Sequence, residues 1–340
     1  VGPQQGGADP GPSGDAKGDA SRVTDARLGR WRMLADNWLG GRVTRDGQRA
    51  EELIAERASE ISVSVQETAL GIIRVVNANM ARAIRAIAQE RGYDPRPFTL
   101  LPFGGAGPMH CCDLAHEMGI PRVLVPARPG ILSALGVAIA DIVKDYSRTV
   151  MMRGDDINRT QLDEEFHGME GLAREELEKE GLPMDRTVPQ RFLDVRYVGQ
   201  SFELTIDYPS PRRQIDTARM RRSIADSFYR ARLQRFGYAD RGEAVEIVNL
   251  RLKLGLKMDK PQIVAGQAAD SGSTPALIGE AQGVFSGGTV TTRLYDRENL
   301  RTGDQISGPA IVLQMDTTVV ITPGWTGTAD DYGNLVLETE

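Results

Sequence analysis

The sequence predicts an α/β fold that is followed by a small α+β layer and a β-rich C-terminal cap. The α/β class rests on residues 98–125, where an apolar run precedes a glycine loop, a helical segment and a second apolar run. Residues 155–258 then alternate between helical and strand patterns, and residues 281–338 contain short strand-like runs separated by glycine and proline. We therefore expect three domains, at residues 1–152, 153–258 and 259–340.

The composition excludes two classes of partner. The 340 residues are 40% hydrophobic and 26% charged, which is ordinary for a globular protein. A net charge of −6 gives no electrostatic reason to expect nucleic acid or an anionic membrane surface. No apolar run approaches the length of a bilayer span, and no basic segment followed by an apolar core marks a signal peptide. We expect no nucleic-acid partner and no membrane partner.

The two cysteines indicate the cellular compartment, and the first residue indicates whether the sequence is part of a longer protein. Cys111 and Cys112 are neighbours on a predicted helix, where successive side chains point about 100° apart, so they make a poor disulfide. A reducing, cytoplasmic setting is therefore expected. The chain begins with Val1 rather than Met, which indicates a processed product or a piece of a longer protein.

The first segments in chain order are a loop and two helices. Residues 1–25 are rich in glycine, proline, aspartate and serine, which is typical of a loop. Gln48–Arg57 is predicted as a short helix, and Ser64–Arg91 as a long one that opens on a capping-box pattern. Asn77, Asn79 and Arg82 interrupt the apolar spacing of the long helix. They form either a solvated face or the polar side of a cleft beside the glycine loop.

The central stretch carries the candidate binding site. Phe98–Phe103 is predicted as a short buried strand, Met109–Met118 as a helix that ends at Gly119, and Arg122–Val125 as the next strand. Between strand and helix lie the loop residues Gly104, Gly105, Ala106 and Gly107, followed by Pro108 in the first helical turn. The loop is neither a P-loop nor the dinucleotide fingerprint, because no Gly-Lys-Ser/Thr closes it and His110 stands where the third glycine would be. Nucleotide binding and a merely tight strand-to-helix turn both remain open.

The remaining chain predicts alternating helices and strands. Helices are expected at Ile131–Ile142, Gln161–Glu180 and Asp216–Phe236, and the second of these should bury Phe166, Met169, Leu172 and Leu177. Strands are expected at Asp145–Met152, Thr187–Val198, Ser201–Tyr208 and Glu243–Leu256, with a hairpin around Gly199-Gln200. After a linker at Lys260–Pro275, further strands are expected at Ala281–Phe285, Thr289–Leu294, Ala310–Gln314, Thr317–Ile321 and Leu335–Glu338.

No catalytic residue and no protein metal ligand is assigned from the pattern. His110, Asp113 and Glu117 share one helix face, which suits either a metal or acid–base site or an ordinary helix surface next to a loop. Cys111 near a helix N-terminus could have a lowered pKa, but no histidine–asparagine arrangement supports a thiol nucleophile.

Several segments carry a resemblance to a known family. FGGAGPMH and the following LAHEMGIPRVLVPARPGILSALGVAIADIVKDYSRT closely resemble the hydantoinase/5-oxoprolinase A-type family. That family includes ATP-dependent hydantoinases, 5-oxoprolinases and related subunits of acetone and acetophenone carboxylases. Four other segments match it: VGPQQGGADPGP with VTDA; VNANMARAIR; DVRYVGQSFELT; and GPAIVLQMDTTVVITPGW with DYGNLVL. The similarity covers nearly the whole chain.

The resemblance implies part of an actin/hexokinase-like ATPase fold. The FGGAGP segment would form its adenosine side, with Gly104, Gly105, Ala106 and Gly107 against the ribose and α-phosphate. Asn79 and Arg82 are further candidates for contacts with the nucleotide. ATP would phosphorylate an amide or enolate oxygen of a small-molecule substrate, with Mg²⁺ screening the transferred phosphate. The implied reaction is opening of a cyclic amide, and the alternatives are a ketone carboxylase subunit or a non-catalytic assembly subunit.

The sequence departs from the family in two places. The amino-terminal half that carries both phosphate-binding loops is absent, so the chain corresponds to a carboxy-terminal half. Where relatives have a cysteine and a tyrosine after ADPGP, this chain has Ser13-Gly14-Asp15-Ala16-Lys17, which puts the role of that loop in doubt. The resemblance therefore implies two partners: a B-type subunit, and an upstream chain or missing half that supplies the phosphate loops.

Overall fold

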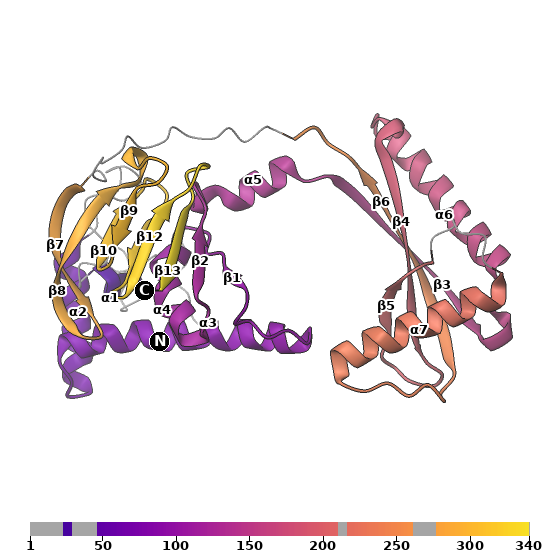
Figure 1. Ribbon diagram of the computed structural model, residues 1–340, viewed down its shortest axis with the longest axis horizontal. Helices are drawn as coiled ribbons and strands as arrows, with labels where there is room; N and C mark the ends of the chain where they lie inside the picture. The colour runs from indigo at the N-terminus through magenta and orange to yellow at the C-terminus, as the bar shows by residue number, and fades with distance from the viewer. Residues whose placement is uncertain (1–22, 29–45, 210–215, 261–276, 340) are drawn as a thin grey trace. The chain divides into compact units, whose positions relative to one another are not determined.

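The computed structural model describes residues 23–28, 46–209, 216–260 and 277–339 (Figure 1). The chain divides into two compact units. The first unit contains residues 1–89, 93–137 and 262–340, and the second contains residues 90–92 and 138–261. The sequence features predicted for residues 1–22 and for most of the linker at Lys260–Pro275 lie outside the described residues.

The first unit begins with helices, two of which the sequence predicted. Helices α2 (Gly47–Glu60) and α3 (Val65–Glu90) are those predictions. Helix α1 (Val23–Leu28) precedes them and was not predicted, because its first residues belong to the segment that the sequence indicated as a loop. The predicted pair meets at α3: the Glu67 N–H donates to Ser64 Oγ at 3.1 Å, as a capping box requires, while the Glu67 carboxylate accepts from the Ser64 hydroxyl at 2.9 Å. Helix α2 begins in the same way, because the Asp46 carboxylate accepts from the Arg49 N–H.

The central stretch has the predicted order of elements. Strand β1 (Thr99–Leu100) pairs in parallel with β2 (Arg122–Val125), and between them lie the turn η2 (Gly107–Met109) and helix α4 (Cys111–Met118). Gly119 ends α4 in the left-handed conformation with φ of 69°, which suits glycine. The predicted strand at Phe98–Phe103 is shorter than expected: only two of its residues pair, and both terminal phenylalanines are about half exposed.

The C-terminal strands complete two sheets of the first unit. One sheet has the order β1-β2-β13-β12-β9, and its last members are β9 (Gln305–Ser307), β12 (Trp325–Ala329) and β13 (Leu335–Thr339). The other has the order β11-β10-β8-β7, from β7 (Leu277–Phe285), β8 (Gly288–Asp296), β10 (Ala310–Leu313) and β11 (Thr318–Ile321), with the short turn η6 (Arg297–Asn299) after β8. The sequence did not predict β9 and β12.

The C-terminal strands share a core with the glycine-loop segment. Strand β13 pairs antiparallel with β2, with Leu337 opposite Val123, and both side chains are fully buried. One buried cluster joins Cys112 and Leu114 of α4 to Ile321 of β11. The structure thus differs from the predicted separate domain at residues 259–340. The physical reason is that β1 covers only one edge of β2, and β13 covers the other.

The second unit is an antiparallel sheet with two helices. Its 4-stranded sheet has the order β3-β6-β4-β5, built from β3 (Ile142–Arg153), β4 (Thr187–Tyr197), β5 (Leu204–Asp207) and β6 (Val245–Leu256). The helices are α6 (Arg159–Lys179) and α7 (Thr217–Phe236), and the short turns η4 (Gly154–Asp156) and η5 (Met184–Arg186) flank α6. The turn η3 (Pro129–Ile131) and helix α5 (Leu132–Ile139) precede this sheet in the chain. The predicted helix–strand order and the β4–β5 hairpin are confirmed.

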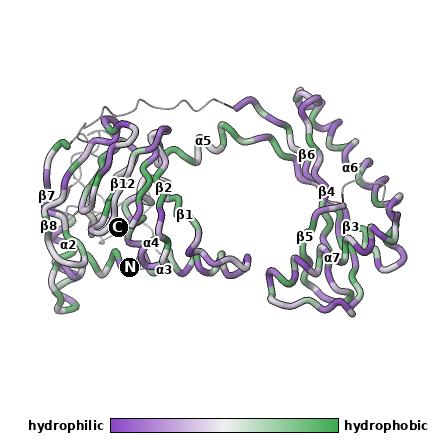
Figure 2. Tube along the Cα trace, in the orientation of Figure 1, coloured by the Kyte–Doolittle hydropathy of each residue, from purple (hydrophilic) through white to green (hydrophobic). Residues whose placement is uncertain are grey.

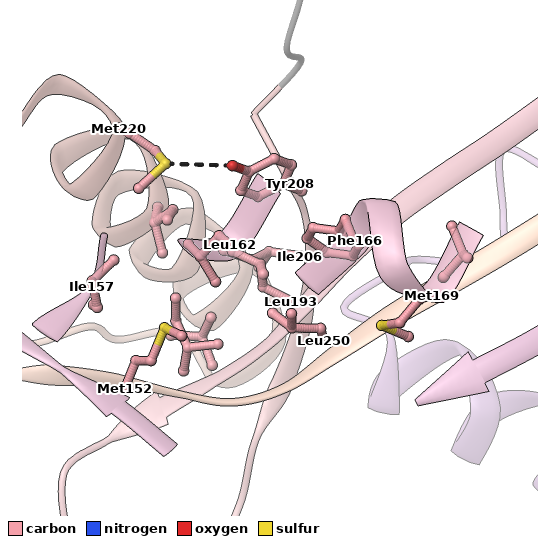
Figure 3. Close-up of a cluster of buried hydrophobic side chains, with 14 of the residues drawn as sticks. Met152, Ile157, Leu162, Phe166, Met169, Leu193, Ile206, Tyr208, Met220 and Leu250 are labelled. Carbon is pink, nitrogen blue, oxygen red and sulfur yellow. Dashed lines mark hydrogen bonds between the residues drawn. The ribbon is translucent and has the colours of Figure 1, made fainter. Parts of the chain in front are cut away.

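The two helices and the sheet of the second unit enclose one apolar core. Figure 3 shows part of it, including Phe166 and Met169 of α6 next to Leu193 and Leu250 of the sheet. Of the residues predicted to be buried on α6, Leu172 is 57% exposed, so that prediction is wrong. The helical period places Ala173 on the buried face instead, in line with Phe166, Met169 and Leu177. Hydrophilic and hydrophobic colours accordingly alternate along α6 in Figure 2.

Candidate nucleotide-binding site at the glycine loop

Three segments of the first unit meet at the glycine loop. The Gly104 N–H donates to the Pro129 carbonyl at 2.7 Å, which ties the loop to the turn η3. The Gly130 N–H donates to Asp316 Oδ2 at 2.8 Å. The Thr317 hydroxyl donates to the Gly105 carbonyl at 3.0 Å. The loop is therefore held from both sides, by the turn η3 and by the turn between β10 and β11.

The loop leaves backbone groups available on its open side. Gly104 has φ of 80°, and a Cβ built there would meet no atom within 4 Å. Ala106 is exposed. In the described part of the chain, the N–H groups of Gly105 and Ala106 make no hydrogen bond. Open space next to free N–H groups suits a polar or anionic ligand that approaches the backbone closely.

Buried polar atoms occur in the β10–β11 turn, which contacts the loop through Thr317, and in η6. Gln314, 5% exposed, donates from Nε2 to the Ala127 carbonyl at 2.7 Å. Among the described residues, Gln314 Oε1 and Asp316 Oδ1 have no partner although both atoms are buried. The Arg297 side chain is also buried, and burial lowers the pKa of its guanidinium to about 10. These buried polar groups thus lie in the β10–β11 turn and in η6.

The polar residues of α3 fall on different faces of that helix. Asn77 is buried, and its Oδ1 lies 2.6 Å from Nδ1 of His110 at the start of α4. Asn79 and Arg82 are exposed. The hypothesis that Asn77, Asn79 and Arg82 share one polar side is wrong, because successive residues of a helix are about 100° apart and positions 77 and 79 therefore point in opposite directions. The proposed nucleotide contacts of Asn79 and Arg82 stay predictions.

The alternative chemistries around α4 gain no support. His110 is buried against Asn77, and Arg85 donates to the Glu117 carbonyl. No group of three or more His, Cys, Asp or Glu side chains that could hold a metal ion occurs in the described ranges. Cys111 and Cys112 are free and buried. The hydrogen bond with the Cys112 thiol, together with burial, raises the pKa of the Cys111 thiol well above its usual value, which is the reverse of activation.

Some of the site was missed in the sequence. Neither the turn η3 nor Asp316 and Thr317 were candidates, although both stretches lie inside segments that carried the family resemblance. The loop prediction at Gly104–Gly107 required only local signals, whereas these partners are distant in sequence.

The search for membrane spans found none: among the described residues, every helix is too short or too polar to cross a bilayer.

The chain is a mixed α/β protein with a glycine loop between a strand and a helix, and sequence comparison identifies its family. The hydantoinase/oxoprolinase family matches residues 1–146, and the hydantoinase/oxoprolinase C-terminal domain matches residues 154–339. The chain belongs to the hydantoinase/oxoprolinase family.

Individual relatives agree with this assignment. Caprolactamase subunit alpha of Pseudomonas jessenii is 31% identical over 96% of this chain and 47% of its own length. 5-Oxoprolinase 1 of Arabidopsis thaliana is 29% identical over 100% of this chain and 28% of its own length. The chain thus spans half or less of these relatives.

Solved structures share the fold. The crystal structure of ATP-dependent caprolactamase from Pseudomonas jessenii matches with a TM-score of 0.86 and 31% identity, over 100% of this chain and 50% of that one. The nucleotide-free structure of acetone carboxylase matches with a TM-score of 0.72 and 25% identity, over 94% of this chain and 46% of that one. The solved structures are thus described as ATP-dependent enzymes, and several relatives are named as subunits, among them the acetophenone carboxylase gamma subunit of Aromatoleum aromaticum.

Proposed function

We propose that this chain forms the adenosine-side half of an ATP-dependent enzyme that opens a cyclic amide. The observation that carries the proposal is the match to ATP-dependent caprolactamase over 100% of this chain with a TM-score of 0.86. The reaction class is transfer of the ATP γ-phosphoryl group to the amide oxygen, which makes the ring carbonyl carbon electrophilic toward water. The C–N bond of the ring then breaks, and the ring-opened amino acid, ADP and phosphate are released.

The glycine loop would hold the nucleotide. In this proposal the N–H groups of Gly105 and Ala106 face the α-phosphate, and Gly104 leaves room for the ribose. Asn79 and Arg82 are proposed to contribute further polar contacts. Mg²⁺ would accompany the phosphates, and we assign it to no residue of this chain, since the described residues contain no group of three or more His, Cys, Asp or Glu side chains that could hold a metal ion. The phosphate-binding loops, a B-type subunit and the catalytic groups are proposed to come from outside these 340 residues.

The loop assignment is tested by filling the space around it. Gly105→Val should abolish ATP binding by the assembled enzyme, because a branched side chain would occupy the space of the ribose and phosphate. Gly287→Val is the control, since a Cβ at Gly287 meets no atom within 4 Å and Gly287 lies in the β7–β8 turn. Nucleotide affinity is measured by calorimetry or fluorescent-analogue displacement. Unchanged affinity in a folded Gly105→Val protein would overturn the assignment.

The substrate class is tested by substrate-dependent ATP hydrolysis of the assembled enzyme. We expect 5-oxoproline, a hydantoin or caprolactam to stimulate release of phosphate, and the 340-residue chain alone to hydrolyse no ATP. The acetone carboxylase match supports a second candidate, a ketone carboxylase subunit. Phosphate release that requires acetone or acetophenone together with bicarbonate would favour that candidate, and release with none of these substrates would count against both.

A further inference from the structure

The turn between β10 and β11 reaches the glycine loop from the far end of the chain. Thr317 and Gly105 are 212 residues apart in sequence, yet the Thr317 hydroxyl donates to the Gly105 carbonyl at 3.0 Å. The Thr317 side chain is fully buried, and β11 packs directly against the turn η2 through Val320 and Met109. The loop is therefore hydrogen-bonded to a buried residue of the β10–β11 turn, in the sheet with the order β11-β10-β8-β7.

The Thr317 hydrogen bond sets the direction of a backbone N–H. A trans peptide is planar, with its carbonyl and the following N–H on opposite sides. Holding the Gly105 carbonyl toward Thr317 therefore points the Ala106 N–H away from the β10–β11 turn. That N–H is one of the two loop groups that make no hydrogen bond in the described part of the chain. The buried hydroxyl thus orients a group that is free to meet a ligand.

The neighbouring residue holds the same loop by a second route. Asp316 accepts from the Gly130 N–H, and the preceding Pro129 carbonyl accepts from the Gly104 N–H. A Cβ at Gly130 would lie 2.6 Å from the Asp316 carboxylate, so this contact leaves no space for a side chain. Adjacent residues of one turn therefore fix the loop at Gly104 and at Gly105.

We propose that Thr317 is a positioning residue for nucleotide binding, and that Asp316 assists it by holding the turn η3. This inference rests on the proposed ATP site at the glycine loop. Without the Thr317 hydroxyl, the Gly105–Ala106 peptide is free to rotate, and binding a nucleotide must first order it. The β10–β11 turn is then a part of the binding site rather than a part of a distant cap.

The test compares two buried threonines, Thr317 just before β11 and Thr292 in β8 of the same sheet. Thr317→Val removes the loop hydrogen bond at nearly constant volume. Thr292→Val is the matched control, because Thr292 is also fully buried and its hydroxyl donates to a backbone carbonyl, that of Val290, at 3.1 Å. Thr317→Ser should restore the bond. Two quantities are measured: the ATP dissociation constant of the assembled enzyme, and hydrogen–deuterium exchange over residues 104–109 of the chain without nucleotide.

Thr317→Val is expected to weaken ATP binding by about 3- to 10-fold, the usual worth of one hydrogen bond, and to speed exchange in the loop. Thr292→Val should lose similar stability with neither effect, and Thr317→Ser should recover both. Loop exchange and ATP affinity that change equally in the two valine variants would overturn the inference while leaving the ATP site intact. Failure of the unsubstituted enzyme to bind ATP would instead overturn the proposed function, and unchanged loop exchange in Thr317→Val would then still refute the positioning role.

Discussion

At the scale of single residues, Asn77 and His110 form a buried polar pair that joins α3 to the helix behind the glycine loop. Their side-chain atoms lie 2.6 Å apart, and both residues are less than a tenth exposed. An asparagine in the middle of an apolar helix is a poor helix former. Its presence here is explained by a hydrogen bond that fixes the start of α4, next to Pro108 and the loop.

This pair predicts that the asparagines of α3 will respond differently to mutation. Asn77→Ala should destabilise the first unit by about 1–3 kcal/mol, because a buried histidine nitrogen loses this hydrogen-bond partner. Asn79→Ala should change stability by no more than about 0.5 kcal/mol, since Asn79 is exposed, and should instead weaken nucleotide binding. Urea unfolding and nucleotide titration separate the two effects. Equal stability losses in both variants would contradict the assignment.

At the scale of secondary-structure elements, α6 shows how helical period and burial are connected. The two ends of the buried face, Leu162 and Leu177, are fully buried in the core that α6 shares with the sheet of the second unit. Leu172 lies on another face, where the surrounding sequence is rich in glutamate. A leucine on a charged helix therefore does not by itself mark the core.

Two leucines of α6 provide a matched pair of substitutions. Leu177→Ala should destabilise the second unit by about 2–5 kcal/mol, because it removes a fully buried side chain and leaves a cavity. Leu172→Ala should cost no more than about 0.5 kcal/mol, because the side chain is 57% exposed and alanine is at least as good a helix former. Chemical denaturation measures both. A large loss from Leu172→Ala would indicate that this residue is covered in the protein.

At the scale of the whole molecule, the two units differ in whether their residues are continuous in sequence. The second unit is nearly continuous, from residue 138 to residue 261. The first unit combines the glycine-loop segment with residues 262–340. In its five-stranded sheet, β13 is an interior strand between β2 and β12. Stability of the glycine loop therefore depends on the end of the chain.

Truncation tests this dependence. A chain that ends at residue 276 should lose protection from proteolysis throughout residues 46–137, because β2 loses β13 and the α4 core loses β11. Residues 138–260 should remain protected in the same sample, which serves as the internal control. Mass spectrometry of the fragments gives the result. Persistent protection of residues 98–125 would support the separate C-terminal domain that the sequence predicted.

What the sequence determined by itself is local. The capping box at Ser64, the stop at Gly119, the strand at Arg122–Val125 and the glycine loop follow from neighbouring residues, whose backbone preferences and hydrogen bonds act over a few positions. The tertiary structure alone decided which distant strands pair and which polar groups meet. Thr317 reaches Gly105 and β13 joins β2 because burial of apolar strands selects partners by shape and register, and these long-range choices leave no periodic signal in the chain.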